Sequence, residues 1–185
     1  MKRIAVYCGS SIGASSDYEQ AAIALGNELA QRGIGLVYGG SRTGLMGAVA
    51  DAVLQAGGEV IGIIPHHLAH REIAHEQLTK LIKVDSMHER KHQMMDLSDG
   101  FIAMPGGAGT MEEYFEVITW SQIGLHKKPC GLLNVKGYYN PLIHLFDHMV
   151  QEQFLKGRYA ALNLVAEQPH ELLEQMANFR HPDEL

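Results

Sequence analysis

Residues 104–116, which read MPGGAGTMEEYFE, join three glycines to a hydroxyl and several carboxylates where an apolar run becomes a helical pattern. Glycine lets the backbone approach a ligand closely, and the free N–H groups at a helix N-terminus favour an anion. Thr110 would offer its hydroxyl at the helix start, and Glu113 would follow one turn later. The same T-x-x-E spacing is that of a capping box, which alone would explain both residues and is slightly favoured when the stretch is taken by itself. Glu112 is interpreted as a solvated surface residue.

Arg90 is the second residue whose type and position could do chemistry. It lies in the helical pattern SMHERKHQMM, and with Met87, Met94 and Leu97 it forms a stripe along one side of the helix. An arginine in an apolar stripe needs a carboxylate or a ligand, because an unpaired buried charge is very costly. In an alternative stripe Lys91 takes this place, and Arg90 lies on the rim with a surface partner. Periodicity does not decide between the two.

Three glycine-bearing loops each follow a predicted strand and lead into a helix: CGSSIGAS at 8–15, YGGSRTGLMG at 38–47 and PGGAGT at 105–110. In open α/β sheets ligands bind beyond the carboxyl ends of the strands, so these loops predict an anion site at one edge. The dinucleotide fingerprint G-x-G-x-x-G is absent after the first strand, and the Walker pattern G-x-x-x-x-G-K-[ST] does not occur. A single phosphate therefore fits better than a cofactor with a pyrophosphate.

Short apolar runs alternate with helical patterns along the chain. Six runs are apolar almost throughout, as strands buried on both faces are: 3–8, 34–39, 59–65, 81–85, 101–105 and 130–135. Capping boxes at Ser16 with Glu19 and at Ser86 with Glu89 open two of the helices, and helical patterns over 140–155 and 169–179 end the chain. This alternation predicts an α/β fold, with a Rossmann-like, doubly wound, mainly parallel sheet flanked by helices. Because no linker or repeat interrupts the pattern, residues 1–185 are interpreted as a single domain.

Composition excludes several classes of protein. Of the 185 residues 46% are hydrophobic and 19% are charged, which is typical of a globular domain and not of a disordered chain. The net charge of −6 disfavours a nucleic-acid partner, since that binding depends on lysines and arginines. No segment approaches the roughly 18 consecutive apolar residues of a membrane span, and the first apolar run is too short for a secretory signal. Two widely separated cysteines fit a reducing compartment, so a cytoplasmic protein is expected.

The motifs above resemble those of the Lonely Guy family, the cytokinin-activating phosphoribohydrolases that are often mislabelled lysine decarboxylases. MPGGAGTMEE matches P-G-G-x-G-T-x-x-E, SMHERKHQMM matches M-x-x-R-K-x-x-M, and YGGSRTGLMG resembles the family's second glycine loop. The likeness covers nearly the whole chain. It implies a Rossmann-fold homodimer without a cofactor, which hydrolyses the N-glycosidic bond of a nucleoside 5′-monophosphate to a base and ribose 5-phosphate. The base implied is adenine, with or without an N6 substituent.

The resemblance also assigns roles to residues. Arg90 and Glu113 correspond to the catalytic pair, and a carboxylate suits that role because it can stabilise an oxocarbenium-like C1′ and deprotonate the attacking water. The phosphate would be held by Gly106, Gly107, Gly109 and Thr110. Further substrate contacts are expected at Ser10, Gly39, Gly40, Met87, Lys91 and Met94. The methionines would give a purine adaptable apolar walls, although methionine on a helix is more often core filler.

Two other features, a group of histidines and Cys8, give weaker evidence of a functional site. His66 and His70 are spaced four residues apart, as two metal ligands on a helix are, but Pro65 and the mixed spacing of PHHLAHREIAH indicate a surface loop with a short helix. Cys8 has no histidine or aspartate near it in a recognisable nucleophile arrangement. No metal site is therefore expected.

Two further function classes stay open. A decarboxylase that uses pyridoxal phosphate would need a Schiff-base lysine, and Lys91 is the lysine near the motifs. A non-catalytic carrier of a nucleotide or cofactor would use the same scaffold for binding alone. The presence of both Arg90 and Glu113 favours hydrolysis, because a carrier does not need a carboxylate beside C1′.

Overall fold

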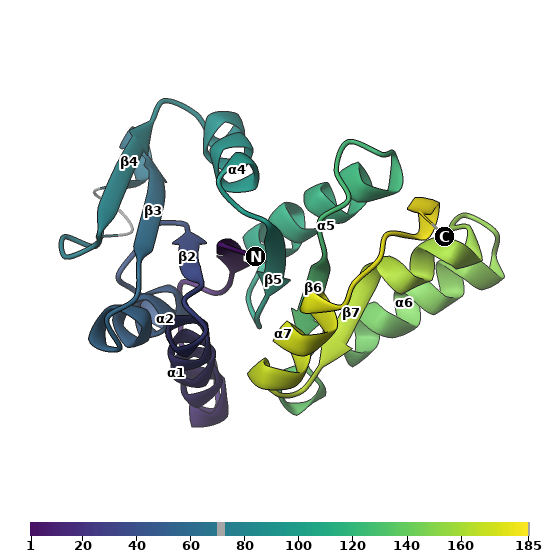
Figure 1. Cartoon of the computed structure of the whole chain (residues 1–185), viewed down its shortest axis with the longest axis horizontal. Coiled ribbons are helices and arrows are strands. Elements are labelled where there is room, and N and C mark those ends of the chain that lie inside the picture. The colour runs from purple at the N-terminus through teal and green to yellow at the C-terminus, as the bar shows by residue number, and fades with distance from the viewer. Residues whose placement is uncertain (70–72, 185) are drawn as a thin grey trace.

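The computed structural model describes residues 1–69 and 73–184, which fold around a seven-stranded sheet (Figure 1). Its strands are β1 Arg3–Tyr7, β2 Gly35–Tyr38, β3 Val60–Pro65, β4 Lys80–Val84, β5 Gly100–Ala103, β6 Cys130–Leu133 and β7 Asn163–Ala166. They lie in the order β4-β3-β2-β1-β5-β6-β7, and each neighbouring pair is parallel. The predicted α/β, Rossmann-like architecture is confirmed.

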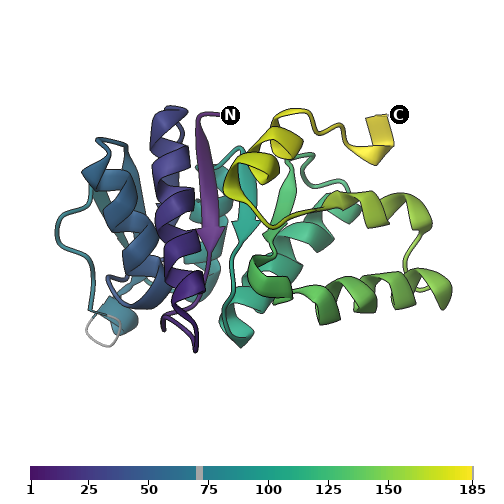
Figure 2. The same ribbon diagram turned by 90° about the horizontal axis from the view of Figure 1, so that it is seen from below.

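Helices cover both faces of this sheet. They are α1 Ser16–Gln31, α2 Gly44–Gln55, α3 His66–Ala69, α4 Met87–Asp96, α5 Ala108–Gln122, α6 Asn140–Gln151 and α7 Pro169–Ala177, with 3₁₀ turns η1 Val135–Gly137, η2 Gly157–Leu162 and η3 Pro182–Glu184. Helices α1, α2 and α7 lie on the face seen in Figure 2, and α4, α5 and α6 lie on the other. Side chains of β1 alternate between the two cores, so that Ile4 packs with the first group and Ala5 with the second. A strand buried on both faces has to be apolar throughout, which is why the continuous runs located the strands.

Two local expectations are wrong, and one strand is missing from the predicted set. The seventh strand, β7, was not predicted: its first residue, Asn163, interrupts the apolar stretch 159–166, and three of its four residues are only partly buried. The helix expected over 140–155 ends at Gln151, and Gln153 beyond it adopts a left-handed φ of 64°. Helix α1 is capped by Ser15 and not by Ser16, since the Ser15 hydroxyl accepts the N–H of Asp17 at 3.3 Å.

The strand order creates a crevice between β1 and β5. These strands are neighbours, yet α1 leads from β1 towards β2 on one side and α5 leads from β5 towards β6 on the other. In Figure 2, β1 runs from the N-terminus at the upper edge towards the lower edge, so the carboxyl ends of the parallel strands lie at that lower edge. The loops after β1 and β5 meet there, where the Gly9 N–H donates to the Pro105 carbonyl at 3.0 Å. Doubly wound folds bind ligands at this kind of switch point.

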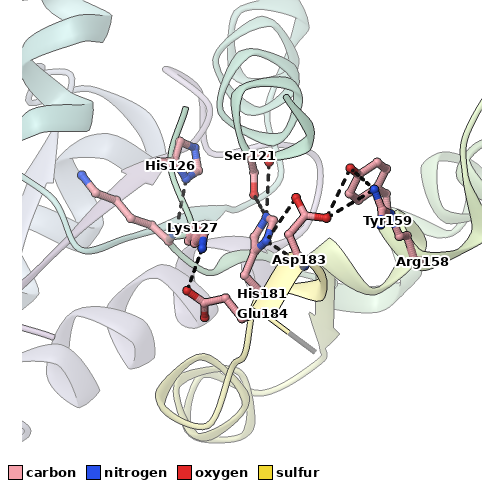
Figure 3. A network of polar contacts seen from close by, with 9 residues as sticks. Ser121, His126, Lys127, Arg158, Tyr159, His181, Asp183 and Glu184 are labelled. Atoms are coloured by element: carbon pink, nitrogen blue, oxygen red, sulfur yellow. Dashed lines mark hydrogen bonds and ion pairs between the residues drawn. The ribbon is translucent and has the colours of Figure 1, made fainter. Parts of the chain in front are cut away.

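A second polar region, the C-terminal cluster of Ser121, His181, Asp183 and Arg158, holds the end of the chain against the end of α5 (Figure 3). His181 Nε2 lies 3.2 Å from Ser121 Oγ, and its Nδ1 accepts the N–H of Asp183 at 3.2 Å. Arg158 Nη2 lies 3.4 Å from Asp183 Oδ1. Ser121 and His181 are both buried, so this cluster fastens η3 to the body of the protein.

Candidate active site

A cleft of about 230 Å³ opens at the carboxyl edge, beside the loop that follows β1 and the start of α5. Helices α2, α3 and α4 complete its lining. Seven residues expected from the sequence line it: Ser10, Met87, Arg90, Gly107, Gly109, Thr110 and Glu113. Both members of the expected catalytic pair therefore face the same cavity.

The first turn of α5 borders this cleft. The helix begins at Ala108 with Gly107 as its N-cap, and no described side chain hydrogen-bonds to its end as a cap. Thr110 thus lies inside the helix, and the capping-box interpretation of Thr110 with Glu113 is wrong. A Cβ added at Gly107 or Gly109 would meet open space, whereas one at Gly106 would collide with the Thr110 hydroxyl. The N–H groups of this turn lack a side-chain cap and suit an anion.

The second glycine loop supports the cleft through its last residues. Gly44, with a φ of +60°, packs so closely on the β1 loop that an added Cβ would overlap the backbone of Ser10. The N–H of Leu45 donates to the Gly9 carbonyl at 3.1 Å. These contacts hold Ser10 at the rim of the cleft, where its side chain is exposed.

Arg90 is fixed by a carbonyl within β3 and by a carbonyl just after β2. Its Nε donates to the Ile63 carbonyl at 3.1 Å, and its Nη2 donates to the Gly39 carbonyl at 2.8 Å. The residue is only 5% exposed, so the interpretation that places Arg90 on the rim is wrong. Main-chain carbonyls thus satisfy part of a guanidinium that was expected to need a carboxylate or a ligand.

Gly39 and Gly40 lie beside Arg90 and the loop after α3, outside the cleft lining. A Cβ added at Gly39 would collide with Arg90 Nη2, so this glycine leaves room for the guanidinium. Gly40 has a φ of +79°, and its carbonyl accepts the N–H of His75 at 2.9 Å. Their predicted contact with substrate stays a prediction.

Lys91 and Met94, also expected to contact substrate, are not part of the cleft lining either. Met94 is 1% exposed in the core beneath α4 and α5. Lys91 pairs with Glu112 and, at 3.0 Å between Nζ and Oε2, with Glu116. Burial lowers the pKa of Lys91, but hydrogen bonds to Glu112 and Glu116 outweigh burial and raise the pKa overall. The amine is therefore charged at neutral pH.

The charge of Glu113 affects the pKa of two neighbouring side chains, Cys8 and Tyr7. Burial raises the pKa of the Cys8 thiol, and the negative charge of Glu113 raises it further. Burial and then Glu113 also raise the pKa of Tyr7. Cys8 thus borders the cleft as a protonated thiol, which agrees with the interpretation that it is not a nucleophile.

Comparison with known proteins identifies the family. A family model described as "Possible lysine decarboxylase" matches residues 46–176. A cytokinin riboside 5′-monophosphate phosphoribohydrolase of Arabidopsis thaliana is 49% identical over 178 residues, which make up 96% of this chain and 82% of that protein. A protein of the same name from Oryza sativa subsp. japonica is 47% identical, over 96% of this chain and 74% of its own length. The chain belongs to the Lonely Guy family.

The fold of this Lonely Guy protein occurs more widely. The molybdenum cofactor binding protein of Rippkaea orientalis superposes with a TM-score of 0.69 over 95% of this chain and 94% of its own. Its sequence is 24% identical, so the likeness concerns the fold alone.

The Lonely Guy cleft also contains residues that the sequence analysis did not assign. Met46 from α2 and Leu68 from α3 add apolar surface beside Met87, and Gly9, in the loop after β1, contacts both of the other glycine loops. Glu112 is exposed, as interpreted from the sequence, but it also borders the cleft and pairs with Lys91. The GLMG stretch after the second strand could have indicated Met46, but no pattern near Leu68 marks it.

The histidine-rich stretch of this Lonely Guy chain forms no group of three or more metal ligands within the residues described. His66 is exposed and lies 3.8 Å from Asp85. His75 is buried, and its Nε2 lies 2.9 Å from Asp51 Oδ1. His70, the other member of the spaced pair, lies outside the described residues.

Proposed function

We propose that this protein is a nucleoside 5′-monophosphate phosphoribohydrolase. It splits the N-glycosidic bond of AMP, of N6-substituted cytokinin ribotides, or of both, into free base and ribose 5-phosphate. The observation that carries this proposal is that Arg90 and Glu113 line one cleft together with the start of α5. Relatives that share nearly half of the sequence carry this activity in their names.

The start of α5 would bind the phosphate, and Glu113 would act one turn further along the helix. The N–H groups around Gly107 and Gly109 and the Thr110 hydroxyl would donate to the phosphate oxygens. Glu113 would then stabilise the positive charge that develops on the ribose and take a proton from the attacking water. The water oxygen bonds to C1′, the C1′–N bond breaks, and the base leaves with its electron pair and gains a proton.

Arg90 would supply a fixed positive charge in the cleft. Its hydrogen bonds to the Ile63 and Gly39 carbonyls hold the guanidinium in place before substrate arrives. A cation nearby favours the ionised form of a carboxylate, which Glu113 needs in order to act as a base. The same charge would stabilise negative charge on the departing base.

Met46, Leu68 and Met87 would form the base subsite. They come from three different helices and give the cleft its apolar surface. Methionine adapts its shape to a ligand, so an apolar N6 substituent can be accommodated beside adenine. We expect the isopentenyl ribotide to be hydrolysed at least as efficiently as AMP.

The test is chromatographic. The purified protein is incubated with AMP, with isopentenyladenosine 5′-monophosphate and with adenosine, and free base and ribose 5-phosphate are quantified over time. Both monophosphates should release base, and kcat/KM for adenosine should be at least roughly 10²-fold lower because the bound phosphate orients the ribose. Equal turnover of adenosine and AMP would contradict the proposal.

The two other function classes, a non-catalytic carrier and a pyridoxal phosphate enzyme, predict different results. A carrier would bind AMP without releasing adenine, and the same chromatographic assay with a binding measurement separates it from a hydrolase. A pyridoxal phosphate enzyme needs a lysine that loses its proton to form a Schiff base. Lys91 does not fit that role, because it is paired with Glu112 and Glu116 and its pKa is raised.

We propose further that the protein is one domain over residues 1–185 and acts as a cytoplasmic homodimer without a cofactor. Family membership supports the dimer, and sequence composition supports the compartment. None of the helices within 1–69 and 73–184 combines the length and apolar character needed to cross a bilayer. Sedimentation should give twice the mass of one chain, and treatment with a chelator should leave hydrolysis unchanged.

A further inference from the structure

Lys91 links the two helices that carry the expected catalytic pair. It follows Arg90 on α4, and its partners Glu112 and Glu116 flank Glu113 on α5. The side chain of Lys91 is 10% exposed and that of Glu116 is 23% exposed, so the contact between Nζ and Oε2 at 3.0 Å is largely shielded from water. Shielding of this kind weakens the screening of an ion pair by solvent and salt.

The two catalytic side chains are anchored to different parts of the molecule. Arg90 is bound to the Ile63 carbonyl within β3 and to the Gly39 carbonyl just after β2, so it is fixed relative to the sheet. Glu113 moves with α5. A slide or rotation of α5 against α4 would therefore change the separation of the two side chains without breaking the hydrogen bonds of Arg90.

The two carboxylates that Lys91 contacts are well placed to prevent such a movement. Glu112 and Glu116 are four residues apart and so lie on the same side of α5, one turn from each other. A cation bound between two points along a helix resists sliding along the axis as well as rotation about it. A single contact would resist less.

We propose that Lys91 is a positioning residue, which bridges Glu112 and Glu116 and thereby fixes Glu113 relative to Arg90. The proposal rests on the proposed function, in which both residues act on one substrate. It departs from the expectation that Lys91 contacts the substrate itself. Misplacement of a reacting group by about 1 Å can cost around 10²-fold in rate, so a contact outside the reacting atoms can govern turnover.

Steady-state hydrolysis of AMP by two variants tests this role. Lys91→Met keeps the apolar stem but removes the charge, whereas Lys91→Arg keeps a charge that can reach both carboxylates. We expect Lys91→Met to lower kcat by roughly tenfold to hundredfold and to change KM by less than about threefold. Lys91→Arg should restore kcat to within about fivefold of the wild type.

Glu116→Gln tests the same link from α5. It should lower kcat by less than Lys91→Met does, because Glu112 remains as a partner. The double variant Lys91→Met/Glu116→Gln should be no slower than Lys91→Met alone, since residues that act through one contact have non-additive effects. The single variant Glu116→Gln keeps the proposal testable if Lys91→Met fails to fold.

Lys128→Met is the matched control. Lys128 also reaches α4, where its Nζ donates to the Met95 carbonyl at 2.7 Å, but it contacts the last turn of the helix, away from Arg90. This variant should lower the midpoint of thermal unfolding and leave kcat within about twofold of the wild type. The control separates a loss of stability from a loss of positioning.

Several outcomes would overturn the proposal. If folded Lys91→Met has the kcat of the wild type, Lys91 does not position Glu113. If the effects of Lys91→Met and Glu116→Gln add in the double variant, Lys91 does not act through Glu116. A raised KM with unchanged kcat, or equal losses in Lys91→Arg and Lys91→Met, would indicate direct contact with substrate instead. Wild-type protein that releases no base would overturn the proposed function, and this proposal with it.

Discussion

The cleft and the C-terminal cluster both bring reactive types of side chain together, but these side chains differ in their burial and in their hydrogen bonds. In the cleft, Arg90 and Glu113 border a cavity of about 230 Å³ beside an open helix start. In the C-terminal cluster, Ser121, His181 and Asp183 follow one another as in a hydrolase triad (Figure 3). By residue type alone, the second group resembles a known catalytic arrangement more closely.

Proton positions and burial distinguish the two regions. The Asp183 N–H donates to His181 Nδ1 at 3.2 Å, so the neutral ring carries its proton on Nε2 and directs it at the carbonyl and hydroxyl oxygens of Ser121. In a hydrolase triad the aspartate holds the proton on Nδ1, and Nε2 accepts the proton of serine. The C-terminal cluster therefore has the tautomer that cannot activate serine. Ser121 is also 0% exposed, which leaves no path for a substrate.

The difference teaches that a catalytic site is recognised by the donors, acceptors and charges that border a space open to a ligand, and not by residue type alone. The histidine of the C-terminal cluster uses both ring nitrogens in hydrogen bonds to the protein, which fasten η3 to α5. The cleft instead offers N–H groups without a side-chain cap, a carboxylate and a fixed cation around a space that a substrate can enter. Predictions about the two regions should accordingly separate activity from stability.

The largest expected effect belongs to Glu113. Glu113→Gln keeps the shape of the side chain but removes the base, so base release from AMP should fall by at least roughly 10²-fold. Circular dichroism should show an unchanged fold. Ser121→Ala is the counterpart in the C-terminal cluster, and it should leave kcat within about twofold of the wild type. A near-wild-type rate for Glu113→Gln would remove Glu113 from the mechanism.

A smaller loss of activity is expected from Gly39→Ala. The added methyl would collide with Arg90 Nη2 and displace the guanidinium from the carbonyls of Gly39 and Ile63, so kcat should fall by about tenfold. Gly157→Ala is the control, because its added Cβ meets Val150 only at an ordinary 3.9 Å. If Gly39→Ala hydrolyses AMP as fast as Gly157→Ala does, the position of the Arg90 guanidinium does not affect turnover.

His181→Ala should affect stability and spare activity. It removes hydrogen bonds to Ser121 and Asp183 in a buried setting, so the free energy of unfolding should fall by about 1–3 kcal/mol. Urea titration measures this loss, and the AMP assay at 25 °C should show kcat unchanged. Loss of hydrolysis at full stability would mean that the C-terminal cluster takes part in the reaction after all.

The smallest effect concerns pH and the neighbouring His126. Burial lowers the pKa of His126, whose Nε2 donates to the Val117 carbonyl at 2.8 Å. The folded state thus disfavours the charged ring, and the unfolded state takes up its proton first as the pH falls. The free energy of unfolding should therefore decline as the pH drops below the ordinary histidine value of about 6.5, down to the lowered pKa of the folded state.

His126→Gln isolates this contribution. Urea titrations at pH 7 and pH 5 should show a smaller decline for the variant than for the wild type, because glutamine does not titrate. An identical decline in both proteins would assign the pH dependence to other groups.

Much of the fold could be predicted because each central strand is buried on both faces and so has an apolar sequence. The alternation of strands and helices then placed the glycine loops at the carboxyl edge of the sheet. Strand β7 was not predicted because Asn163, its first residue, interrupts the apolar stretch 159–166, and because three of its four residues are only partly buried. The start of α5 was misplaced by two residues, because T-x-x-E has the same letters inside a helix as at its N-cap.

The site was predictable in its motifs but not in its contacts. Arg90 and Glu113 could be found because they lie in recognisable patterns, and the structure brings them to one cleft. The partners of Lys91 depend on how α4 packs against α5, and Leu68 arrives from a helix that no local pattern ties to the site. Contacts of this kind are decided by tertiary packing, which neighbouring residues in the sequence do not encode.

The protonation of Cys8 affects how the cleft reacts with oxidants and alkylating reagents. Peroxides and alkylating reagents attack the thiolate form of cysteine, and that form is scarce when the pKa is high. Burial and the charge of Glu113 both raise the pKa of Cys8, so the carboxylate proposed to activate water also keeps the adjacent sulfur protonated. Oxidants that disable enzymes with an exposed, acidic cysteine at their centre should therefore leave the sulfur of Cys8 unmodified.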